Sequence, residues 1–342
     1  MPDPTSPIAT PRILVSPPSD ANHAHLGWPK LTVTSKGRHI LAYAAGRTHT
    51  IGGSPAVSVS EDGVEFSDPT ILRVFSEGDD YPHCGNLAIG TTADDVVILL
   101  AMGHRGNEAN TIFGWASVGG GENWQEINVA ALSAGRTGSV YGHVFHVPGR
   151  GYAVCGHYRQ GSYPHDVGLW ICFSQDGLHW AAPEHVTDEA LVEPAVIPTD
   201  EAIVGLIRHT DPGLTSGYAS LRASRRRMDW EVSQSPVRSA SGARSTSPFI
   251  VRERESDRLF ALLTERKSEG NTPGRISLWV STDDGQAWTD RGTLVDFPAG
   301  DTNTDFGYPW MAQREDGSWL MAFYSGERDG PNAIWGFEFQ TD

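Results

Sequence analysis

The clearest pattern along the chain is a pair of short apolar runs separated by a polar turn. Between residues 192 and 208, the apolar run 195–197 is followed by the turn 198–200 and by a second apolar run at 202–207. Runs of this length around turn residues are typical of a β-hairpin. Glu193 precedes the first run and Arg208 follows the second, so we predict that both charged side chains lie at the open end of one hairpin.

The same two-strand pattern occurs six times. Each copy begins near an aromatic residue or a proline and ends in a polar cluster. The copies are residues 28–47, 81–105, 141–159, 192–208, 246–266 and 308–327. No segment of useful length has the 3.6-residue period of a helix, so the pattern favours an all-β chain.

A second motif falls between these hairpins, a Ser-rich turn that in the regular copies contains Asp and Gly and closes on an aromatic residue. The copies are 60–66, 117–124, 174–180, 224–230 and 281–288, and their closing aromatics are 58, 56, 50 and 58 residues apart. Turns of this composition are held by their own side chains, and each adds two strands to a hairpin. The copies at 117–124 and 224–230 are less regular.

Together the two motifs predict a six-bladed β-propeller of four-stranded antiparallel blades. The last unit lacks a fourth strand, and the N-terminal run 11–16 is expected to supply it and close the ring. We expect residues 1–342 to form a single propeller domain, with residues 1–10 as a flexible or extended arm.

Composition narrows the possible partners. The 342 residues carry a formal charge of −16, which disfavours nucleic acid and anionic membranes. No apolar run approaches the ~18 residues that a membrane helix needs, and no secretion signal is visible at the start. The three cysteines (Cys84, Cys155 and Cys172) lie in apolar runs and are expected to be reduced core thiols, which fits a cytoplasmic location. No spacing resembles a metal site, and no cofactor is expected.

Strand direction predicts where the chemistry gathers. The start of the first strand and the end of the second share one end of each hairpin, so residues there should converge near the propeller axis. The Ser-rich turns fall at the opposite end and are expected to be structural. The candidates on the converging face are Trp28, Arg47, His83, His104, Arg105, Tyr141, His143, Arg159, Glu193, Arg208, Glu265, Tyr308 and Trp310. Polar groups focused on one axial hollow are typical of a ligand site.

These motifs resemble the sialidase superfamily, whose blades carry the Ser-x-Asp-x-Gly-x-x-Trp turn. The stretch 40–47, ILAYAAGR, is similar to a sialidase segment ending in a conserved Arg, here Arg47. The resemblance implies that Glu193 is a pocket carboxylate, Arg208 one member of a carboxylate-binding Arg triad, and Tyr308 the nucleophile. Two features depart from the family: Gly27 stands at the position of the first triad Arg, and the loop 48–60 lacks the Asp acid/base. The chain is therefore not a typical sialidase.

Two other groups of propeller enzymes are also similar. Exo-arabinanase-like hydrolases use two carboxylates, which would be Glu193 and Glu265 here, and the gap between the carboxylates separates retaining from inverting chemistry. Propeller uronate lyases and rhamnosidase-like relatives use His, Tyr and Arg. Their counterparts here would be His83, His104, Tyr141 or His143, and Arg159.

The interpretation that follows is an exo-acting glycoside hydrolase that takes an oligosaccharide or glycoside with a terminal, possibly acidic, sugar. Its catalytic candidates are Glu193, Glu265, Tyr308, His83 and His143. The other converging residues would bind the sugar, with Trp28, Tyr141 and Trp310 stacking on its face. A lyase acting on a uronate-containing glycan and a non-catalytic glycan-binding propeller remain alternatives. The sequence does not determine the sugar or the oligomeric state.

Overall fold

The computed structural model describes residues 10–106, 109–133, 138–158, 168–266, 273–297 and 304–341. Every regular element in these ranges is a β-strand, as the sequence predicted. No helix long and apolar enough to cross a membrane occurs in the described part of the chain. Residues 1–9 of the predicted arm lie outside the described ranges.

Backbone pairing divides the strands into six antiparallel groups of four. The first three groups are β2 (His25–Val33), β3 (His39–Gly46), β4 (Ser54–Ser60) and β5 (Thr70–Ile71); β6 (His83–Thr91), β7 (Val97–Arg105), β8 (Ala109–Ser117) and β9 (Trp124–Ile127); and β10 (Gly138–Val147), β11 (Gly151–Tyr158), β12 (Leu169–Ser174) and β13 (Glu184–Thr187). The next two groups are β14 (Leu191–Pro198), β15 (Ala202–His209), β16 (Gly217–Ser224) and β17 (Trp230–Arg238); and β18 (Ser245–Arg252), β19 (Leu259–Glu265), β20 (Gly274–Ser281) and β21 (Thr289–Phe297). The last group is β22 (Thr304–Gln313), β23 (Trp319–Glu327) and β24 (Asn332–Phe339) with β1 (Arg12–Val15), which pairs antiparallel with β24.

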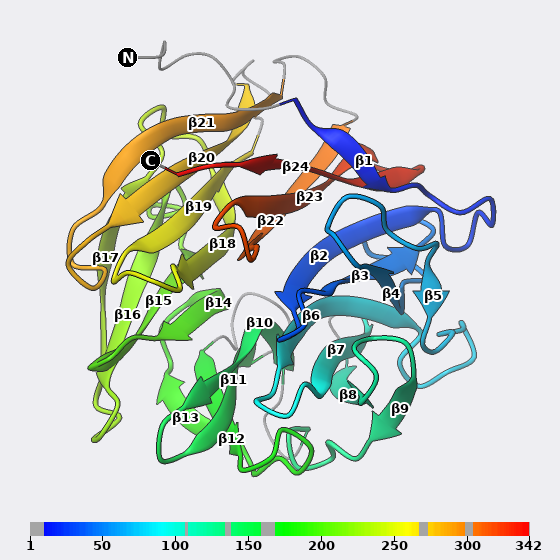
Figure 1. The fold of residues 1–342 in the computed structure, drawn as a ribbon, viewed down its shortest axis with the longest axis horizontal. Helices are drawn as coiled ribbons and strands as arrows, with labels where there is room; N and C mark the ends of the chain where they lie inside the picture. Colours follow the sequence, from blue (N-terminus) through cyan, green and yellow to red (C-terminus); the bar gives the residue numbers. More distant parts are fainter. Residues whose placement is uncertain are drawn as a thin grey trace.

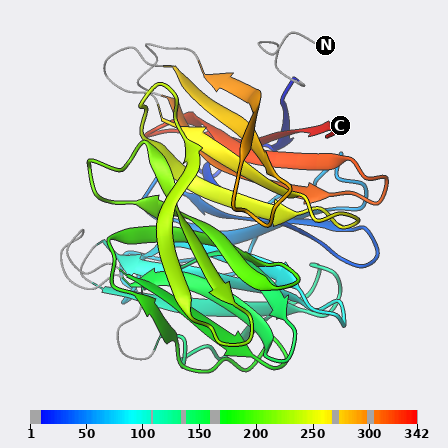
Figure 2. The ribbon, with the colours of Figure 1, turned by 90° about the vertical axis from the view of Figure 1, so that its left-hand side faces the viewer.

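The groups lie around a common centre, with the first strand of each nearest to it (Figure 1). Short parallel pairings join β10 to β6 and β2 to β24, so the six groups are connected into four sheets. From the side, the groups containing β18–β24 lie apart from those containing β6–β13 (Figure 2). This arrangement of four-stranded antiparallel sheets is consistent with a β-propeller.

The sheets pack face to face, and their inner strands are almost completely buried. Every residue of β3 and of β19 is buried, which is why these strands read as continuous apolar runs rather than as alternating ones. Apolar clusters join neighbouring groups, for example β6–β8 with β10–β12. The three cysteines are free thiols in this core, as the sequence predicted.

A β-bulge interrupts each innermost strand near its start. The register shifts fall between Gly27 and Lys30, Cys84 and Leu87, Tyr141 and Val144, Val192 and Ala195, Thr246 and Phe249, and Gly307 and Trp310. Four of the six bulges hold a residue other than glycine in the left-handed backbone region. These residues are Trp28 (φ 55°), Glu193 (57°), Ser247 (56°) and Tyr308 (49°). Such a backbone costs roughly 1–2 kcal/mol per residue, so the surrounding strands must stabilise it.

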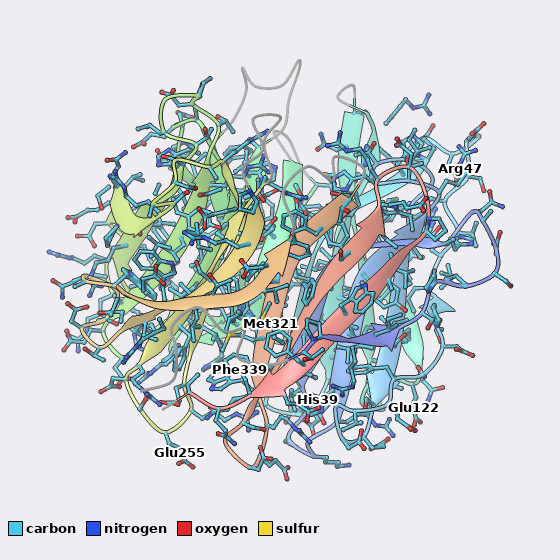
Figure 3. The ribbon with its side chains drawn as sticks, turned by 90° about the horizontal axis from the view of Figure 1, so that it is seen from above. His39, Arg47, Glu122, Glu255, Met321 and Phe339 are labelled. Carbon is cyan, nitrogen blue, oxygen red and sulfur yellow. The ribbon has the colours of Figure 1, made fainter. Side chains whose placement is uncertain are left out.

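The Ser-rich turns lie at the opposite end of the strands from these bulges, because they follow the third strand of a group. Figure 3 shows His39 and Glu122, near two of the turns, at one edge of the molecule and Arg47 at the other. In the turn at 174–180, Asp176 Oδ1 accepts hydrogen bonds from the backbone N–H groups of Leu178 and His179, both at 2.8 Å. Ser174 Oγ accepts the N–H of Gly177 at 2.9 Å. The same bonds recur at 60–66, so these side chains hold the backbone of the turn.

We expect the substitution Asp176→Ala to lower the free energy of unfolding by about 1–2 kcal/mol, because it removes several hydrogen bonds that hold the turn. Slight burial raises the pKa of Asp176, but the hydrogen bonds from His179, Leu178 and Ser174 lower it well below its usual value. The stabilisation is therefore present above about pH 4 and is lost as the pH falls further. Urea denaturation at pH 7 and pH 3, with the exposed Asp94→Ala as control, measures the difference; equal losses in the two variants would contradict the assignment.

Candidate functional site

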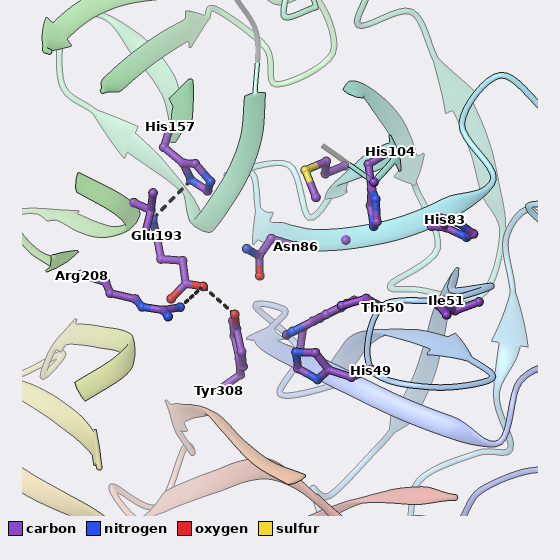
Figure 4. A pocket seen from close by; sticks show the side chains of 15 residues that line it. His49, Thr50, Ile51, His83, Asn86, His104, His157, Glu193, Arg208 and Tyr308 are labelled. Atoms are coloured by element: carbon purple, nitrogen blue, oxygen red, sulfur yellow. Dashed lines mark hydrogen bonds and ion pairs between the residues drawn. The ribbon is translucent and has the colours of Figure 1, made fainter. Parts of the chain in front are cut away.

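A cavity of about 440 Å³ lies among the inner strands, at the end of the strands where the bulges occur. The side chains lining it come from β2, β6, β7, β11, β14, β15 and β22 and from the loop after β3. The lining residues with polar or aromatic groups are Trp28, His49, Thr50, His83, Asn86, His104, His157, Glu193, Arg208 and Tyr308 (Figure 4).

Glu193 is the centre of a hydrogen-bonded group at one side of this cavity. Its Oε1 accepts a hydrogen bond of 2.5 Å from the hydroxyl of Tyr308 and lies 3.0 Å from Nη1 of Arg208. Its Oε2 accepts the backbone N–H of Ser247 at 3.2 Å, and its own N–H donates to Nδ1 of His157 at 3.2 Å. Glu193, Ser247 and Tyr308 are all bulge residues, so the bulges of three different strands build one group.

The charges within this group are fixed by their surroundings. Burial alone would raise the pKa of Glu193, but Arg208 and the hydrogen bond from Tyr308 lower it to about 2. Burial and the neighbouring Glu193 carboxylate raise the pKa of Tyr308 well above its ordinary value. At neutral pH the pair is therefore a carboxylate that accepts the proton of an un-ionised phenol.

A buried lysine lies behind Tyr308. Lys30 is 0% exposed, and its Nζ lies 5.1 Å from the ring centre of Tyr308, 4.8 Å from that of Tyr141 and 4.7 Å from that of Trp310. Its hydrogen bonds go to two backbone carbonyl groups, at 3.3 and 3.5 Å. Burial lowers the pKa of Lys30 to about 7, against the opposing effect of Glu193. Aromatic rings attract a cation through their π faces, so they provide a partner for this ammonium group.

A second polar group lies at the edge of the cavity, around Asp305. His49 Nδ1 lies 2.6 Å from Oδ2 of Asp305. Oδ1 of the same carboxylate accepts hydrogen bonds from Arg266 at 3.0 Å and from the hydroxyl of Tyr324 at 2.9 Å. Burial opposes ionisation of Asp305, but His49 and Arg266 lower its pKa well below the usual range.

This second group has the residue types of a metal site, because ligand atoms of His25, His49 and Asp305 lie within 4.8 Å of one another. Both ring nitrogens of His25 already have protein partners. His25 Nδ1 lies 2.9 Å from the carbonyl oxygen of Gly330, and its Nε2 lies 3.0 Å from the amide nitrogen of Asn332. Asp305 holds a guanidinium and a phenol, as described above. The donor set therefore fits a hydrogen-bonded cluster better than a metal site.

The structure brings together six of the residues that the sequence placed at the site. Those lining the cavity are Trp28, His83, His104, Glu193, Arg208 and Tyr308. Two guanidinium groups lie outside it: Arg47 is paired with the exposed Glu77, and Arg105 donates to backbone carbonyl groups of residues 79 and 80. Arg159 falls outside the described residues.

Three other predicted residues lie behind the lining and not in it. The hydroxyl of Tyr141 donates to the carbonyl of Pro248 at 2.8 Å, and Trp310 is 0% exposed. The ring of His143 lies 4.6 Å from that of Trp310, and its Nε2 lies 3.2 Å from the carbonyl oxygen of Ile250. None of the three contributes to the lining of the cavity, so among the described members of the set expected for a lyase, His83 and His104 line it and Tyr141 and His143 do not.

Glu265 does not accompany Glu193. Its carboxylate forms an ion pair with Arg275 and a hydrogen bond with Ser239, and the side chain is 1% exposed. Arg208 pairs with Val192, which lies one residue before the bulge residue Glu193. Glu265 pairs with Ser245, which lies two residues before the bulge residue Ser247. Because side chains alternate between the two faces of a strand, this offset of one residue turns Glu265 away from the cavity. The two-carboxylate arrangement expected from the sequence is therefore not formed.

Sequence reasoning missed His49, Asn86, Lys30 and Asp305. Asn86 and His49 line the cavity, and the Oδ1 atom of Asn86 is buried without a hydrogen-bond partner among the described residues. The loop after Arg47 joins β3 to β4 at the end of the strands where the polar residues gather. Its side chains can therefore reach the cavity as readily as those at the strand ends. A search of that loop for any acid/base group, and not for Asp alone, would have found His49.

No protein-family model matches the chain, and no curated protein sequence matches it. Solved structures match the chain over most of its length. A protein of unknown function from Dyadobacter fermentans has a TM-score of 0.69 at 16% identity, over 97% of this chain and 99% of that one. The NanB sialidase of Streptococcus pneumoniae (K499G mutant) has a TM-score of 0.69 at 12% identity, over 98% of this chain and 71% of that one. The Trypanosoma rangeli sialidase in complex with the inhibitor DANA has a TM-score of 0.67 at 14% identity, over 93% of this chain and 55% of that one.

The chain has a sialidase-like β-propeller fold. At identities of 12–16% the likeness concerns the fold alone, and one fold carries many activities. The chain spans only about half the length of the Trypanosoma rangeli sialidase.

The buried position of Lys30 predicts an unusual dependence of stability on pH. Because burial lowers its pKa to about 7 in the folded protein, only the unfolded chain holds this proton between about pH 7 and 10. Stability should therefore rise with pH in this window, by about 2 kcal/mol between pH 7 and 9.

The variant Lys30→Met keeps the length of the side chain and removes the proton, so it should lack this rise. Urea denaturation of both proteins at pH 7, 8 and 9 measures the two slopes, and Lys36→Met, which changes an exposed lysine, is the control. Parallel slopes in all three proteins would show that Lys30 keeps its proton in the fold.

Proposed function

We propose that the protein is an exo-acting glycoside hydrolase whose reaction takes place at the Tyr308–Glu193 pair. The observation that supports this most directly is the 2.5 Å hydrogen bond from the Tyr308 hydroxyl to Glu193, at the wall of a cavity of about 440 Å³. This volume lies in the range of pockets that take small ligands. The fold likeness to structures described as sialidases agrees with the proposal.

In the proposed reaction, the oxygen of Tyr308 attacks the anomeric carbon of the terminal sugar as the bond to the leaving group breaks. The phenolic proton passes to Oε1 of Glu193, which already accepts it in a hydrogen bond. Arg208 lies beside the carboxylate and compensates its charge before the transfer. Water then attacks the glycosyl-tyrosine and gives up one proton, which replaces the one that the leaving alcohol takes up, while the proton on Glu193 returns to the phenol. The phenol and the guanidinium group that these steps use both contact the Glu193 carboxylate, which supports the proposal.

The cavity offers several hydrogen-bonding groups to a sugar. His83 and His157 each accept a backbone N–H at Nδ1, from Gly52 and Glu193, so their Nε2 atoms carry the hydrogen and can donate to hydroxyl groups. The buried Oδ1 atom of Asn86 can accept a hydrogen bond from a hydroxyl. The indole of Trp28 supplies an apolar face.

The substrate we propose differs from that of a carboxylate-binding sialidase site. Among the described lining residues, Arg208 is the one guanidinium group, and it is paired with Glu193. Arg47 and Arg266 are paired elsewhere, with Glu77 and Asp305. We therefore propose a terminal sugar held mainly by imidazole and amide groups rather than by three arginines.

We also infer that the six strand groups are the blades of one ring. The support is the order of the inner strands around the centre in Figure 1 and the pairing of β1 with β24, which joins the N-terminal run to the last group. In this arrangement the cavity lies at the axis, where a chain end enters more readily than the middle of a chain.

Turnover should depend on both members of the pair. In a screen of aryl glycosides, Tyr308→Phe removes the attacking oxygen and should lower kcat/KM by at least about 1,000-fold. Glu193→Gln removes the proton acceptor and should lower it by about 100- to 10,000-fold. Tyr152→Phe is the matched control and should keep wild-type turnover. Tyr152 lies at the start of β11, at the opposite end of that strand from the cavity residue His157.

The same screen separates the alternatives. Uronate-containing oligosaccharides are included, and products are followed by reducing ends and by the ultraviolet absorbance of an unsaturated uronate. Hydrolysis gives the first signal without the second, and a lyase gives both. Saturable binding of a sugar without any product would identify a binding propeller, and full turnover in Tyr308→Phe and Glu193→Gln would remove the proposed mechanism.

A further inference from the structure

The loop between β3 and β4 is held in a defined position against the next strand group. The N–H of Arg47 donates to the carbonyl of Ile51 at 3.0 Å, so the loop turns back on itself. The N–H of Cys84 on β6 donates to the carbonyl of Gly53 at 2.8 Å, and the N–H of Gly52 donates to Nδ1 of His83 at 3.1 Å. These bonds fix His49, at the tip of the loop, beside the cavity.

The imidazole of His49 is oriented by Asp305. The Nδ1–Oδ2 distance is 2.6 Å, and Arg266 and Tyr324 bind the other carboxylate oxygen, so Oδ2 is left to face His49. The ring of Trp28 packs against the imidazole at 5.0 Å between ring centres. With Nδ1 facing the carboxylate, Nε2 is the ring atom that can exchange a proton with a ligand. The His49 side chain is 32% exposed and lines the cavity beside Tyr308 (Figure 4).

The partner of Nδ1 distinguishes His49 from two other imidazoles of the cavity. His83 and His157 receive backbone N–H groups at Nδ1, which keeps the hydrogen at Nε2 and makes each a fixed donor. A His whose Nδ1 lies against a carboxylate can instead use Nε2 both to give and to take a proton, because the carboxylate holds the ring in place. The charged and titratable groups around His49 are Asp305, Arg266, His25 and Tyr324.

We propose that His49 is the acid/base of the reaction and that Asp305 is its positioning residue. This inference rests on the proposed hydrolase function. In the first step the bond between the anomeric carbon and the leaving oxygen breaks. The electron pair goes to that oxygen, which takes the proton from Nε2 of His49. In the second step the oxygen of a water molecule bonds to the anomeric carbon while the bond from that carbon to Tyr308 breaks. Nε2 of His49 takes the proton that the water loses, and this transfer restores the imidazolium.

The test uses aryl glycosides of one sugar whose leaving phenols range from acidic to weakly acidic. Loss of a general acid matters most where the leaving oxygen needs a proton. His49→Gln should therefore slow substrates with weakly acidic phenols by about 100- to 10,000-fold, and substrates with strongly acidic phenols by much less. His179→Gln is the matched control, because His179 has the same Nδ1 contact with a carboxylate, 2.7 Å from Asp176, at the opposite end of the strands.

Asp305→Asn tests the positioning role through the same series of phenols. It should lower kcat for weakly acidic phenols more than for strongly acidic ones, as His49→Gln does, because the imidazole loses the carboxylate that orients it. Asp176→Asn removes the equivalent carboxylate contact of His179, away from the cavity, and should leave turnover of every phenol unchanged.

The outcomes are distinguishable. If the wild type hydrolyses glycosides and His49→Gln slows all leaving groups equally, or none, the acid/base assignment is overturned while the hydrolase function stands. An equal loss for all phenols in Asp305→Asn, or no loss, overturns the positioning role. If the wild type hydrolyses no glycoside while Tyr308→Phe and the wild type behave alike, the proposed function fails and this inference fails with it.

Discussion

A bulge near the start of every innermost strand takes one residue out of the alternating pattern of its strand. In four of the six strands that residue is not a glycine, although its backbone is left-handed. Such a conformation is unfavourable for Trp28, Glu193, Ser247 and Tyr308, and it is maintained because buried strands hold the chain on both sides. The bulges place a phenol, a carboxylate and a backbone N–H in contact from three different strand groups. The chemistry proposed for the cavity depends on this backbone feature.

Burial then determines which charges are present. The carboxylate of Glu193 stays ionised in a buried place because Arg208 and two hydrogen-bond donors compensate for lost water. Behind it, no carboxylate of the described residues pairs with Lys30, and aromatic rings surround its amino group instead. Asp305 is compensated separately by Arg266, Tyr324 and His49. The two carboxylates therefore belong to two distinct hydrogen-bonded groups on one cavity.

The repeat in the sequence was sufficient to predict the strands and the face on which polar side chains gather. Glu193 and Arg208 could be placed together because the runs and the turn put both residues at the open end of one hairpin, although the bulge at Glu193 was not predicted. Glu265 could not be placed correctly, since its direction depends on a one-residue offset that is set by the bulge. Tyr141 and Trp310 are aromatic residues at the correct strand ends, but their rings are used to enclose Lys30. His49 lies in a loop whose shape depends on contacts with β6, which the local sequence does not specify.

The loop that carries His49 is separate in sequence from the strands that carry Tyr308 and Glu193, and it meets the strand of Tyr308 through the contact of His49 with Asp305. Mutation can alter the length or residues of such a connection without disturbing the strands beneath it. Over evolutionary time, one propeller could therefore exchange the group that serves the departing alcohol while keeping the group that attacks the sugar. Enzymes built in this way would diversify by replacing one half of their catalytic apparatus at a time.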